Sequence, residues 1–250
     1  MIPGKERPDY GMDAPPVIRN LLVAGFGSIV LSFLVAQFSW RAAPYVAIFL
    51  LWMGPWFILS GILMILSSRF GKYREREHLV DLLDLDGSEH VLDVGCGRGL
   101  ILNEVASRLS SGKAVGIDIW QASDLSGNSP EVTLENARRE GVEDRVEVLS
   151  ADVRELPFED ASFDCITSSM CMHNISSSEE RAKALTEIMR VLKPGGRFAI
   201  LDFRNSKEYA EQLTKLGAID VKRSGLRFKM YPPSRIVTGT KPRIDEGDET

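Results

Sequence analysis

Two long uncharged stretches near the N-terminus constrain this chain more than any other feature. Residues 21–40 and residues 42–68 contain no Asp, Glu, Lys or Arg, and Arg41 alone separates them. A helix rises about 1.5 Å per residue, so each stretch is long enough to cross the roughly 30 Å hydrocarbon core of a bilayer. We therefore expect a transmembrane helical hairpin over residues 20–68, with helices at about 21–40 and 44–67.

Two other structures would also contain long apolar stretches. A hairpin buried in a soluble protein would need polar faces, and these stretches offer only scattered polar residues such as Ser28, Ser32, Gln37 and Ser60. A cleaved signal peptide has one short apolar region before small residues at a cleavage site, whereas two long regions occur here in tandem. The membrane hairpin is favoured over both alternatives.

The charges around the hairpin predict its orientation. Basic residues concentrate on the cytoplasmic side of membrane proteins, and only Arg41 lies in the turn of the hairpin. We expect both termini and the domain after the hairpin to be cytoplasmic, with residues 1–19 as a cytoplasmic N-terminal segment. The stretch 69–76 suits contact with anionic lipids, although ordinary flanking charge explains it equally well. The flanking basic residues are Lys5, Arg7, Arg19, Arg69, Lys72, Arg74 and Arg76.

After the hairpin, segments with strand and helix patterns alternate. This alternation predicts an α/β domain over residues 69–242, with a largely parallel sheet and helices on both of its faces. The stretch that follows Pro242, RIDEGDET, is acidic and polar, and we expect a disordered tail at residues 243–250. Helices are expected at 72–85, 100–109, 130–140, 177–192 and 206–216. Strands are expected at 90–94, 114–117, 146–149, 163–168 and 197–201, with an antiparallel edge pair at 219–222 and 235–238.

Charge and cysteine content exclude several classes of function. The net charge of −5 disfavours general binding to nucleic acid, because a phosphate backbone would be repelled. The three cysteines, Cys96, Cys165 and Cys171, are an odd number without a Cys-x-x-Cys pair. They therefore predict neither a disulfide framework nor a metal site, and they suit a reducing compartment.

A glycine-rich turn follows the first predicted strand of the domain. In the stretch 91–99, VLDVGCGRG, Asp93 ends the strand and is followed by Gly95, Gly97 and Gly99. Such glycines let the backbone bend sharply and let a ligand touch it. A dinucleotide-binding turn would need a small residue in place of Leu100, and a short-chain dehydrogenase would need a Tyr-x-x-x-Lys pair that the sequence lacks. Nicotinamide chemistry is disfavoured.

This turn is the first of four landmarks that occur in a characteristic order. Together they make the chain resemble the class I S-adenosylmethionine-dependent methyltransferases, in particular the branch that includes the ubiquinone and menaquinone biosynthesis methyltransferases. The resemblance covers about residues 72–242 and implies a Rossmann-like methyltransferase sheet with S-adenosylmethionine as cofactor. The landmarks are VLDVGCGRG at 91–99, GID at 116–118, AD at 151–152 before LPF at 156–158, and RVLKPGG at 190–196.

The resemblance also implies roles for individual residues. Asp118 matches the acidic residue that accepts hydrogen bonds from two ribose hydroxyls, and a carboxylate offers two acceptor oxygens for this purpose. Asp152 matches the position that binds the adenine amino group, with Val153 supplying a backbone contact. Taken alone, each carboxylate would be read as a solvated loop residue or a helix cap. The residues expected around the cofactor are Asp93, Gly95, Cys96, Gly97, Gly99, Asp118, Ile119, Trp120, Asp152 and Val153.

The loop after the fourth predicted strand supplies the candidates for chemistry. Methyl transfer needs a well-placed nucleophile more than covalent catalysis, and His173 could accept the proton of that nucleophile. A structural histidine bonded to a carbonyl group is the equal alternative. Met170, Met172, His173 and Asn174 are candidate substrate contacts, whereas Cys171 is expected to pack as a small apolar residue.

Two departures from the family pattern bear on how the site is covered. The polar connection at 120–129 is long for an α/β unit, and we expect it to cover the adenosine. The sequence has no long insertion after Phe203, so the hairpin and the helix at 72–85 should supply the substrate cover. Tyr73 on that helix is a candidate to reach the carboxylate of the cofactor.

The expected function is that of a membrane-anchored methyltransferase. The expected acceptor is a lipophilic or amphiphilic small molecule at the cytoplasmic face, and membrane lipid is the other expected partner. Two alternatives stay open: a noncatalytic membrane-tethered scaffold with this fold, and a methyltransferase of soluble molecules that is anchored only for localisation. The sequence identifies neither the acceptor atom nor the oligomeric state.

Overall fold

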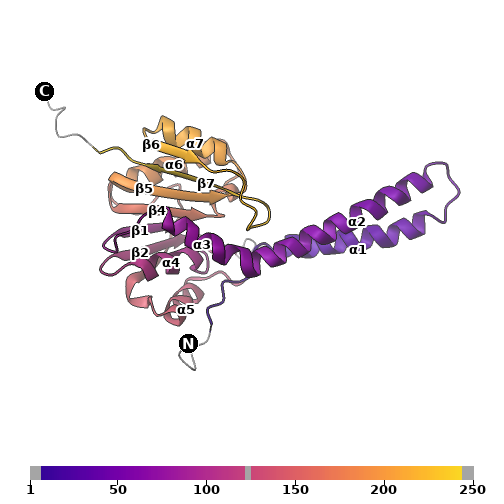
Figure 1. Ribbon diagram of the computed structural model, residues 1–250, viewed down its shortest axis with the longest axis horizontal. Helices are drawn as coiled ribbons and strands as arrows, with labels where there is room; N and C mark the ends of the chain where they lie inside the picture. Colours follow the sequence, from indigo (N-terminus) through magenta and orange to yellow (C-terminus); the bar gives the residue numbers. More distant parts are fainter. Residues whose placement is uncertain (1–6, 122–124, 244–250) are drawn as a thin grey trace.

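The computed structural model describes residues 7–121 and 125–243. It joins a helical hairpin to an α/β domain with a seven-stranded sheet, which confirms the predicted fold class (Figure 1). The helices are α1 (Pro15–Val35), α2 (Ala43–Leu66), α3 (Lys72–Asp81), α4 (Leu100–Arg108), α5 (Pro130–Glu140), α6 (Ser178–Val191) and α7 (Ser206–Lys215). The strands are β1 (His90–Val94), β2 (Lys113–Asp118), β3 (Val146–Ser150), β4 (Phe163–Ser169), β5 (Leu192–Asp202), β6 (Ile219–Arg223) and β7 (Arg235–Thr240). Short helical turns are η1 (Ser67–Gly71), η2 (Glu143–Arg145) and η3 (Met172–Asn174). The predicted tail lies outside the described residues from 244 onward.

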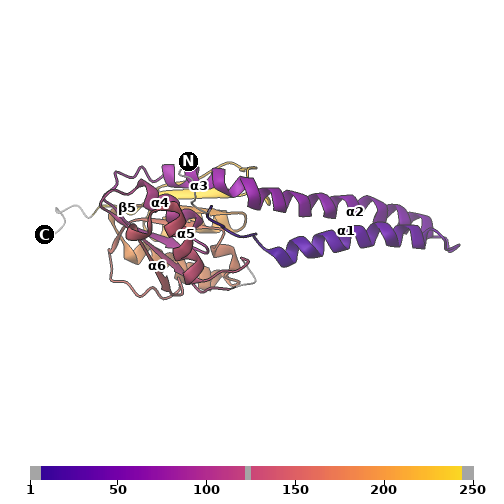
Figure 2. The ribbon, with the colours of Figure 1, turned by 90° about the horizontal axis from the view of Figure 1, so that it is seen from below.

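The hairpin projects from one end of the domain, and α1 and α2 lie side by side along their length (Figure 1 and Figure 2). By length and composition both helices could cross a membrane. Only 17% of the most apolar window of the first helix and 11% of that of the second are buried. Such exposure does not fit helices packed into the core of a soluble protein.

Glycines bring the two helices of the hairpin into close contact. A Cβ atom on Gly25 would lie 2.9 Å from the carbonyl oxygen of Gly54, and a Cβ atom on Gly54 would lie 2.8 Å from the carbonyl oxygen of Gly25. Small residues allow helices in lipid to approach until their backbones touch. The hairpin therefore has a close crossing point that larger side chains at these positions would separate.

The helix boundaries near the hairpin differ from the predicted ones. Helix α1 begins at Pro15 instead of residue 21, because prolines suit the first turn of a helix, and Arg19 consequently lies within the helix. Helix α2 continues through η1 into α3, so that one helical path runs from Ala43 to Asp81. Helix α3 ends before residue 85, since Asp84 has a left-handed backbone conformation with φ of 48°.

The strand order of the sheet is β3-β2-β1-β4-β5-β7-β6. The first five strands in this order are parallel, and β7 pairs antiparallel with both β5 and β6. The predicted antiparallel pair at the edge is therefore confirmed. Strand β5 begins at Leu192, earlier than predicted, because the chain from 193 to 196 forms an irregular part of the ladder instead of a separate turn.

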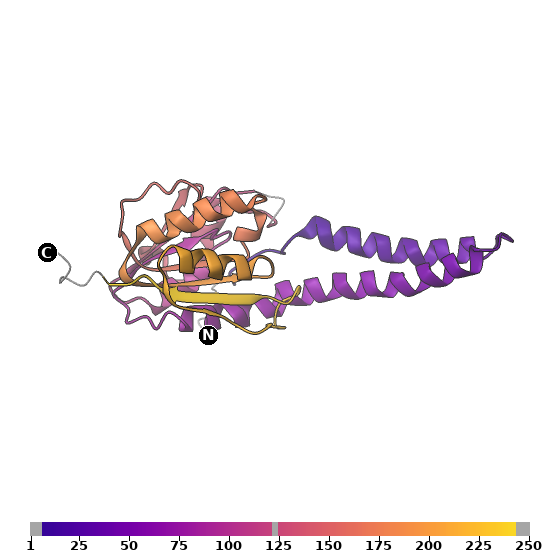
Figure 3. The same cartoon turned by 90° about the horizontal axis from the view of Figure 1, so that it is seen from above.

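Helices cover both faces of the sheet. Helices α3, α4 and α5 pack on one face, where Val91, Leu102 and Ala137 belong to one buried cluster. Helices α6 and α7 pack on the other face, where Leu92 and Leu185 belong to a second cluster; Figure 3 shows this second face in orange. Neighbouring strand residues enter opposite clusters, as the two-residue period of a strand requires.

Candidate active site

A cavity of about 800 Å³ lies where the carboxyl edge of the sheet meets the base of the hairpin. Its wall is formed by the loops that follow β1 to β5 and by parts of α1, α2 and α3. This cavity contains most of the residues that the sequence analysis assigned to the site. They are Asp93, Gly95, Cys96, Gly97, Asp118, Ile119, Asp152, Val153, Met170, His173 and Asn174.

The glycine turn between β1 and α4 brings backbone to the surface of the cavity. Gly95, Gly97 and Gly99 have positive φ angles of 72°, 52° and 86°. A Cβ atom on Gly95 would overlap the side chain of Cys171, so this position excludes any larger residue. Gly99 does not line the cavity and is instead the N-cap residue of α4. The turn thus forms a cradle in which a ligand can touch the chain directly.

Cys96 and Cys171 pack around this turn. The side chain of Cys96 is buried, and burial raises the pKa of its thiol well above the usual value. A thiol held protonated in this way is a poor nucleophile. Cys171 is partly buried and fills the space beside Gly95. Both thiols lie in the cavity wall as packing groups.

Asp118 holds the cradle and the next loop together. Its Oδ2 atom accepts a hydrogen bond from the N–H of Gly97 at 2.9 Å. Its Oδ1 atom accepts from the N–H of Trp120 at 2.7 Å and from Nδ2 of Asn128 at 3.3 Å. A carboxylate has further lone pairs, so Asp118 fits the role of ribose acceptor, which stays a prediction.

Asp93 carries a buried oxygen atom without a partner. Its side chain is 2% exposed, and Oδ1 accepts a hydrogen bond from Oγ1 of Thr167 at 2.8 Å. Its Oδ2 atom has no hydrogen-bond partner among the described residues. Burial raises the pKa of Asp93 to about 7. A cationic donor in the cavity would satisfy this oxygen and favour its ionised form.

These groups fit S-adenosylmethionine. Its amino group matches the unpartnered oxygen of Asp93, and its ribose hydroxyls match the lone pairs of Asp118. Gly97 brings bare backbone to the cavity wall, and among the described residues a Cβ atom there would clash with the side chain of Leu125. When bound, the cofactor supplies an activated methyl group on a sulfonium.

Asp152 lines the cavity but is already paired. Both of its carboxylate oxygens contact the guanidinium of Arg154, at 3.0 Å from Nε and 2.6 Å from Nη2. This contact lowers the pKa of Asp152. Arg154 also reaches Glu180 at 2.8 Å, so the three side chains form one charged group at the rim. An adenine amino group at Asp152 would share the carboxylate with Arg154; the predicted adenine contact stays a prediction.

The loop after β2 differs from the expected arrangement. Ile119 lines the cavity, whereas the ring of Trp120 does not. The indole Nε1 of Trp120 donates to Oγ of Ser150 at 2.7 Å, which holds the ring against the edge of the sheet. Residues 122–124 of the predicted adenosine cover lie outside the described residues, although Leu125 and Asn128 do line the cavity.

His173 lies in the cavity wall beside a buried carboxylate. Its Nδ1 atom is 2.9 Å from Oδ1 of Asp202, although the ring N–H direction is not aligned for a hydrogen bond. The backbone N–H of His173 donates to Oδ2 of the same carboxylate at 3.0 Å. The ring also makes an edge contact with Phe203, with 4.5 Å between centroids. Sequence reasoning missed Asp202, although an Asp at the end of a strand was a visible signal.

The other candidate substrate contacts divide into two groups. Met170 and Asn174 line the cavity. Met172 does not, because its side chain is fully buried in the cluster beneath α6 and α7. The prediction that Met172 contacts substrate is therefore wrong, and this residue belongs to the core.

An N-terminal strap, residues 7–14, crosses the cavity before α1 begins. Tyr10 is 1% exposed, and its hydroxyl donates to Glu140 at 2.6 Å and accepts from Asn103 at 3.1 Å. Burial raises the pKa of the Tyr10 phenol, so it stays protonated. Tyr10 lines the cavity, whereas Tyr73, the predicted contact to the cofactor, lies outside and packs against Tyr10. No local pattern in the sequence signals this strap.

Lys72 fixes the strap to the helical path. Its ammonium group donates to the carbonyl oxygens of Tyr10 at 2.8 Å and Gly11 at 2.7 Å, and it lies 3.2 Å from Asp13. The side chain is 4% exposed, and burial lowers its pKa. The residue where α3 begins thus binds the segment that precedes α1.

The sheet order, the glycine cradle and the aspartates around one cavity form a Rossmann-like domain with the arrangement expected for the S-adenosylmethionine-dependent methyltransferase class. Residues 92–200 match the family model described as a methyltransferase domain.

Comparisons with known proteins agree with this class. The chain is 32% identical over 132 residues to a sterol 4-C-methyltransferase from Caenorhabditis elegans, covering 53% of this chain and 36% of that protein. It is 38% identical over 128 residues to a ubiquinone/menaquinone biosynthesis C-methyltransferase from Vibrio cholerae, covering 51% and 45% respectively. A SAM-dependent methyltransferase structure from Aquifex aeolicus matches with a TM-score of 0.53 at 22% identity, covering 66% of this chain and 89% of that one. The chain thus spans less than half of each of these two curated relatives, and the structural match shows the fold alone.

Proposed function

We propose that this chain is a membrane-anchored S-adenosylmethionine-dependent methyltransferase that acts on a lipophilic or amphiphilic small molecule. One observation carries the proposal: the glycine cradle and the base of the apolar hairpin line the same cavity. Gly97 and Asp118 lie in its wall together with Val17 and Leu21 of α1. An acceptor dissolved in the membrane could therefore meet the methyl group without leaving an apolar surface.

The composition of the hairpin side of the cavity supports an apolar acceptor. Leu21 from α1 and Met64 from α2 line it, and Met side chains adapt to irregular apolar ligands. Two of the relatives are named for sterol and quinone methylation, and both of these substrate classes are lipophilic. For this chain, the same substrate class is a proposal.

In the proposed reaction, the residues of the cavity bind and orient the reactants. Asp93 and Asp118 would hold the cofactor, and the hairpin side of the cavity would hold the acceptor. When bound, the cofactor would supply the methyl group and would keep the electron pair of the broken bond on its sulfur atom. His173 takes the proton that the acceptor releases, and Asp202 lies beside Nδ1 of its ring.

The hairpin and the charges beside it support a cytoplasmic catalytic domain, with both termini on the same side and Arg41 on the other. We propose a division into a cytoplasmic N-terminal segment at 1–19, a hairpin at 20–68 and a methyltransferase domain at 69–242. Helix α1 begins before residue 20, so the first boundary lies inside a helix.

A variant that narrows the hairpin end of the cavity tests the proposal. Leu21 lines the cavity, whereas Val23 on the same helix is 67% exposed and points elsewhere. We expect full-length Leu21→Trp protein to bind the cofactor normally but to transfer much less labelled methyl into an organic extract of membranes. The matched Val23→Trp variant should retain transfer.

Two results would contradict the proposal. Absence of labelled product with the unaltered protein and a membrane extract would favour a noncatalytic scaffold. Equal transfer by the Leu21→Trp variant to a water-soluble acceptor would favour an anchor used only for localisation.

A further inference from the structure

The connection between β6 and β7, residues 224–234, runs along the helical path toward the hairpin. The guanidinium of Arg227 lies 2.6 Å from Glu75 of α3, whose side chain is 2% exposed. Two residues further, the carbonyl group of Lys229 presses against Gly71, where any Cβ atom would overlap it. Residues further along the connection thus contact the helical path at positions closer to the apolar helix α2.

The same connection reaches the apolar part of α2. The N–H of Tyr231 donates to Oγ of Ser67 at 2.9 Å, and the hydroxyl of Tyr231 lies 3.0 Å from Oγ of Ser60. From residue 69 back to residue 60, at about 1.5 Å per residue, the helix advances roughly 13 Å. If α2 spans a bilayer, the connection therefore lies at the depth of the lipid interface.

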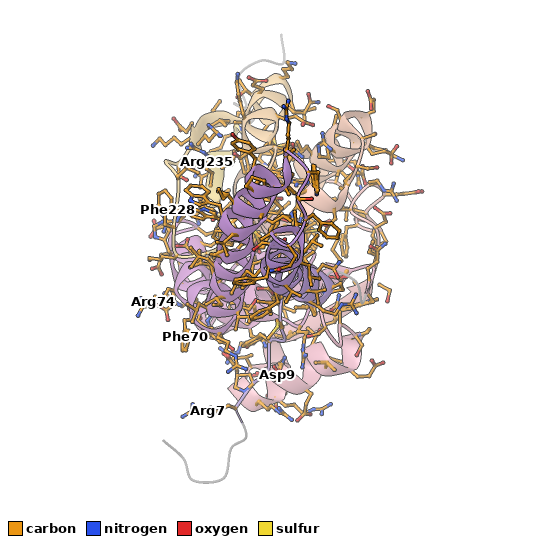
Figure 4. The ribbon with its side chains drawn as sticks, turned by 90° about the vertical axis from the view of Figure 1, so that its right-hand side faces the viewer. Arg7, Asp9, Phe70, Arg74, Phe228 and Arg235 are labelled. Carbon is orange, nitrogen blue, oxygen red and sulfur yellow. The ribbon has the colours of Figure 1, made fainter. Side chains whose placement is uncertain are left out.

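The outer side of this connection carries apolar side chains that contact no core. Phe228 is 75% exposed and Leu226 is 51% exposed, and Phe70 on the helix beside them is 64% exposed. In Figure 4, which views the molecule from the hairpin end, Phe228 and Phe70 project from the same flank as Arg74. Large apolar side chains gathered on one exposed flank indicate an interaction surface.

Cationic side chains accompany these apolar groups. Arg69, Arg74 and Lys229 are exposed. Across residues 7–121 and 125–243, no side-chain hydrogen bond or ion pair engages any of these three groups. The chain as a whole carries a net charge of −5, so a cluster of unpaired positive charge beside exposed aromatic rings is a local exception. Anionic lipid headgroups attract such charge, and aromatic rings favour the membrane interface.

We propose that this flank is a docking surface for anionic phospholipid, by which the methyltransferase domain rests on the membrane beside its hairpin. The docking surface consists of Arg69, Phe70, Arg74, Leu226, Phe228 and Lys229. The proposal rests on the membrane anchoring proposed above and adds a second contact with lipid that the hairpin does not provide. The aromatic and leucine side chains enter the interface, and the cationic groups bind headgroup phosphates.

The test places a polarity-sensitive dye on the docking surface of the full-length protein. Phe228→Cys is labelled in nanodiscs of phosphatidylcholine with or without phosphatidylglycerol, and the parent protein treated with dye measures labelling of native cysteines. Asp144→Cys is the control, because Asp144 is 75% exposed and lies before β3, at the opposite edge of the sheet. We expect a blue shift of dye emission at position 228 that grows with phosphatidylglycerol, and no shift at position 144.

Charge variants complete the test. Arg69→Gln with Arg74→Gln should remove the dependence on phosphatidylglycerol while the protein still co-elutes with the discs. Dye at position 228 that reports water in every lipid, in protein that does co-elute with discs, would overturn the docking surface and would favour another partner. Protein that does not co-elute with discs would instead overturn the anchoring on which the proposal depends.

Discussion

The imidazole of His173 and the carboxylate of Asp202 lie side by side, with 2.9 Å between Nδ1 and Oδ1. Asp202 is 1% exposed and also accepts from the N–H of Phe203 at 2.7 Å, so its position is fixed by the end of β5. Because Nδ1 lies beside the carboxylate, Nε2 is the ring nitrogen that could contact the molecule to be methylated. The backbone N–H of His173 donates to the other oxygen of the same carboxylate, so Asp202 contacts both the main chain and the ring of His173.

This pairing predicts that His173 and Asp202 act as one unit. We expect His173→Gln to lower kcat by about 10² or more, the usual contribution of a general base, with little change in cofactor affinity. Asp202→Asn should lower kcat as well, and the double variant should be no worse than the more damaged single variant. Steady-state kinetics of the four proteins measures this. If the two substitutions lowered kcat independently, so that their effects multiplied in the double variant, Asp202 would be assigned a role in loop structure alone.

Asp118 is expected to control cofactor affinity. Hydrogen bonds to a charged group contribute about 1.5–3 kcal/mol each, so Asp118→Ala should weaken binding at least about tenfold. Calorimetry measures this, with a thermal melt of the same sample, because Asp118 also accepts from the N–H groups of Gly97 and Trp120. Unchanged cofactor affinity in a folded Asp118→Ala protein would show that Asp118 does not bind the ribose.

Asp93 is expected to make cofactor binding depend on pH. Burial raises its folded pKa to about 7, so its contribution to stability is present below the unfolded pKa of about 3.9 and is lost as the pH rises through about 7. A cationic amino group prefers the ionised form, so affinity should rise between about pH 5.5 and 7, by up to about tenfold per unit. Calorimetry should show this slope in the parent protein and not in Asp93→Asn.

Arg41 reports the topology of the hairpin. It lies between α1 and α2 and is exposed, so a thiol probe can reach a cysteine placed there. We expect Arg41→Cys in intact cells to react with an impermeant reagent from outside, and Asp144→Cys to react only after lysis. Reaction of residue 41 only from the cytoplasmic side would contradict the proposed orientation.

Lys72 is expected to hold the strap closed. Lys72→Met leaves the carbonyl groups of Tyr10 and Gly11 without this donor, whereas Asp13 keeps its hydrogen bond from the hydroxyl of Ser68. Each unsatisfied buried group costs about 1–3 kcal/mol, so the variant should melt at a lower temperature and be cut faster by protease before α1. A matched Lys113→Met variant should change neither property, because the Lys113 ammonium group donates to an exposed carbonyl group, that of Asp144.

The sequence predicted features that depend on local spacing. The glycine turn lies where its pattern placed it, and α5 and β1 have the predicted bounds. These elements follow from hydrophobic period, caps and glycine positions, which act over a few residues.

The parts of the site that the sequence did not predict join segments far apart in the chain. Lys72 meets Tyr10, and Tyr231 meets Ser60, through contacts that no periodicity encodes. Met172 was misplaced because a loop methionine can turn into the core or into the cavity, and only the packing around it decides.

If α2 spans a bilayer, the helical path from Ala43 to Asp81 connects the lipid with the cavity. A tilt of α2 would then be passed on through η1 to Lys72, because the helix continues from one to the other. Lys72 donates to the strap, which lines the same cavity as the glycine cradle. Bilayer thickness, which affects the tilt of spanning helices, would thereby act mechanically on the cavity in which methyl transfer is proposed to occur.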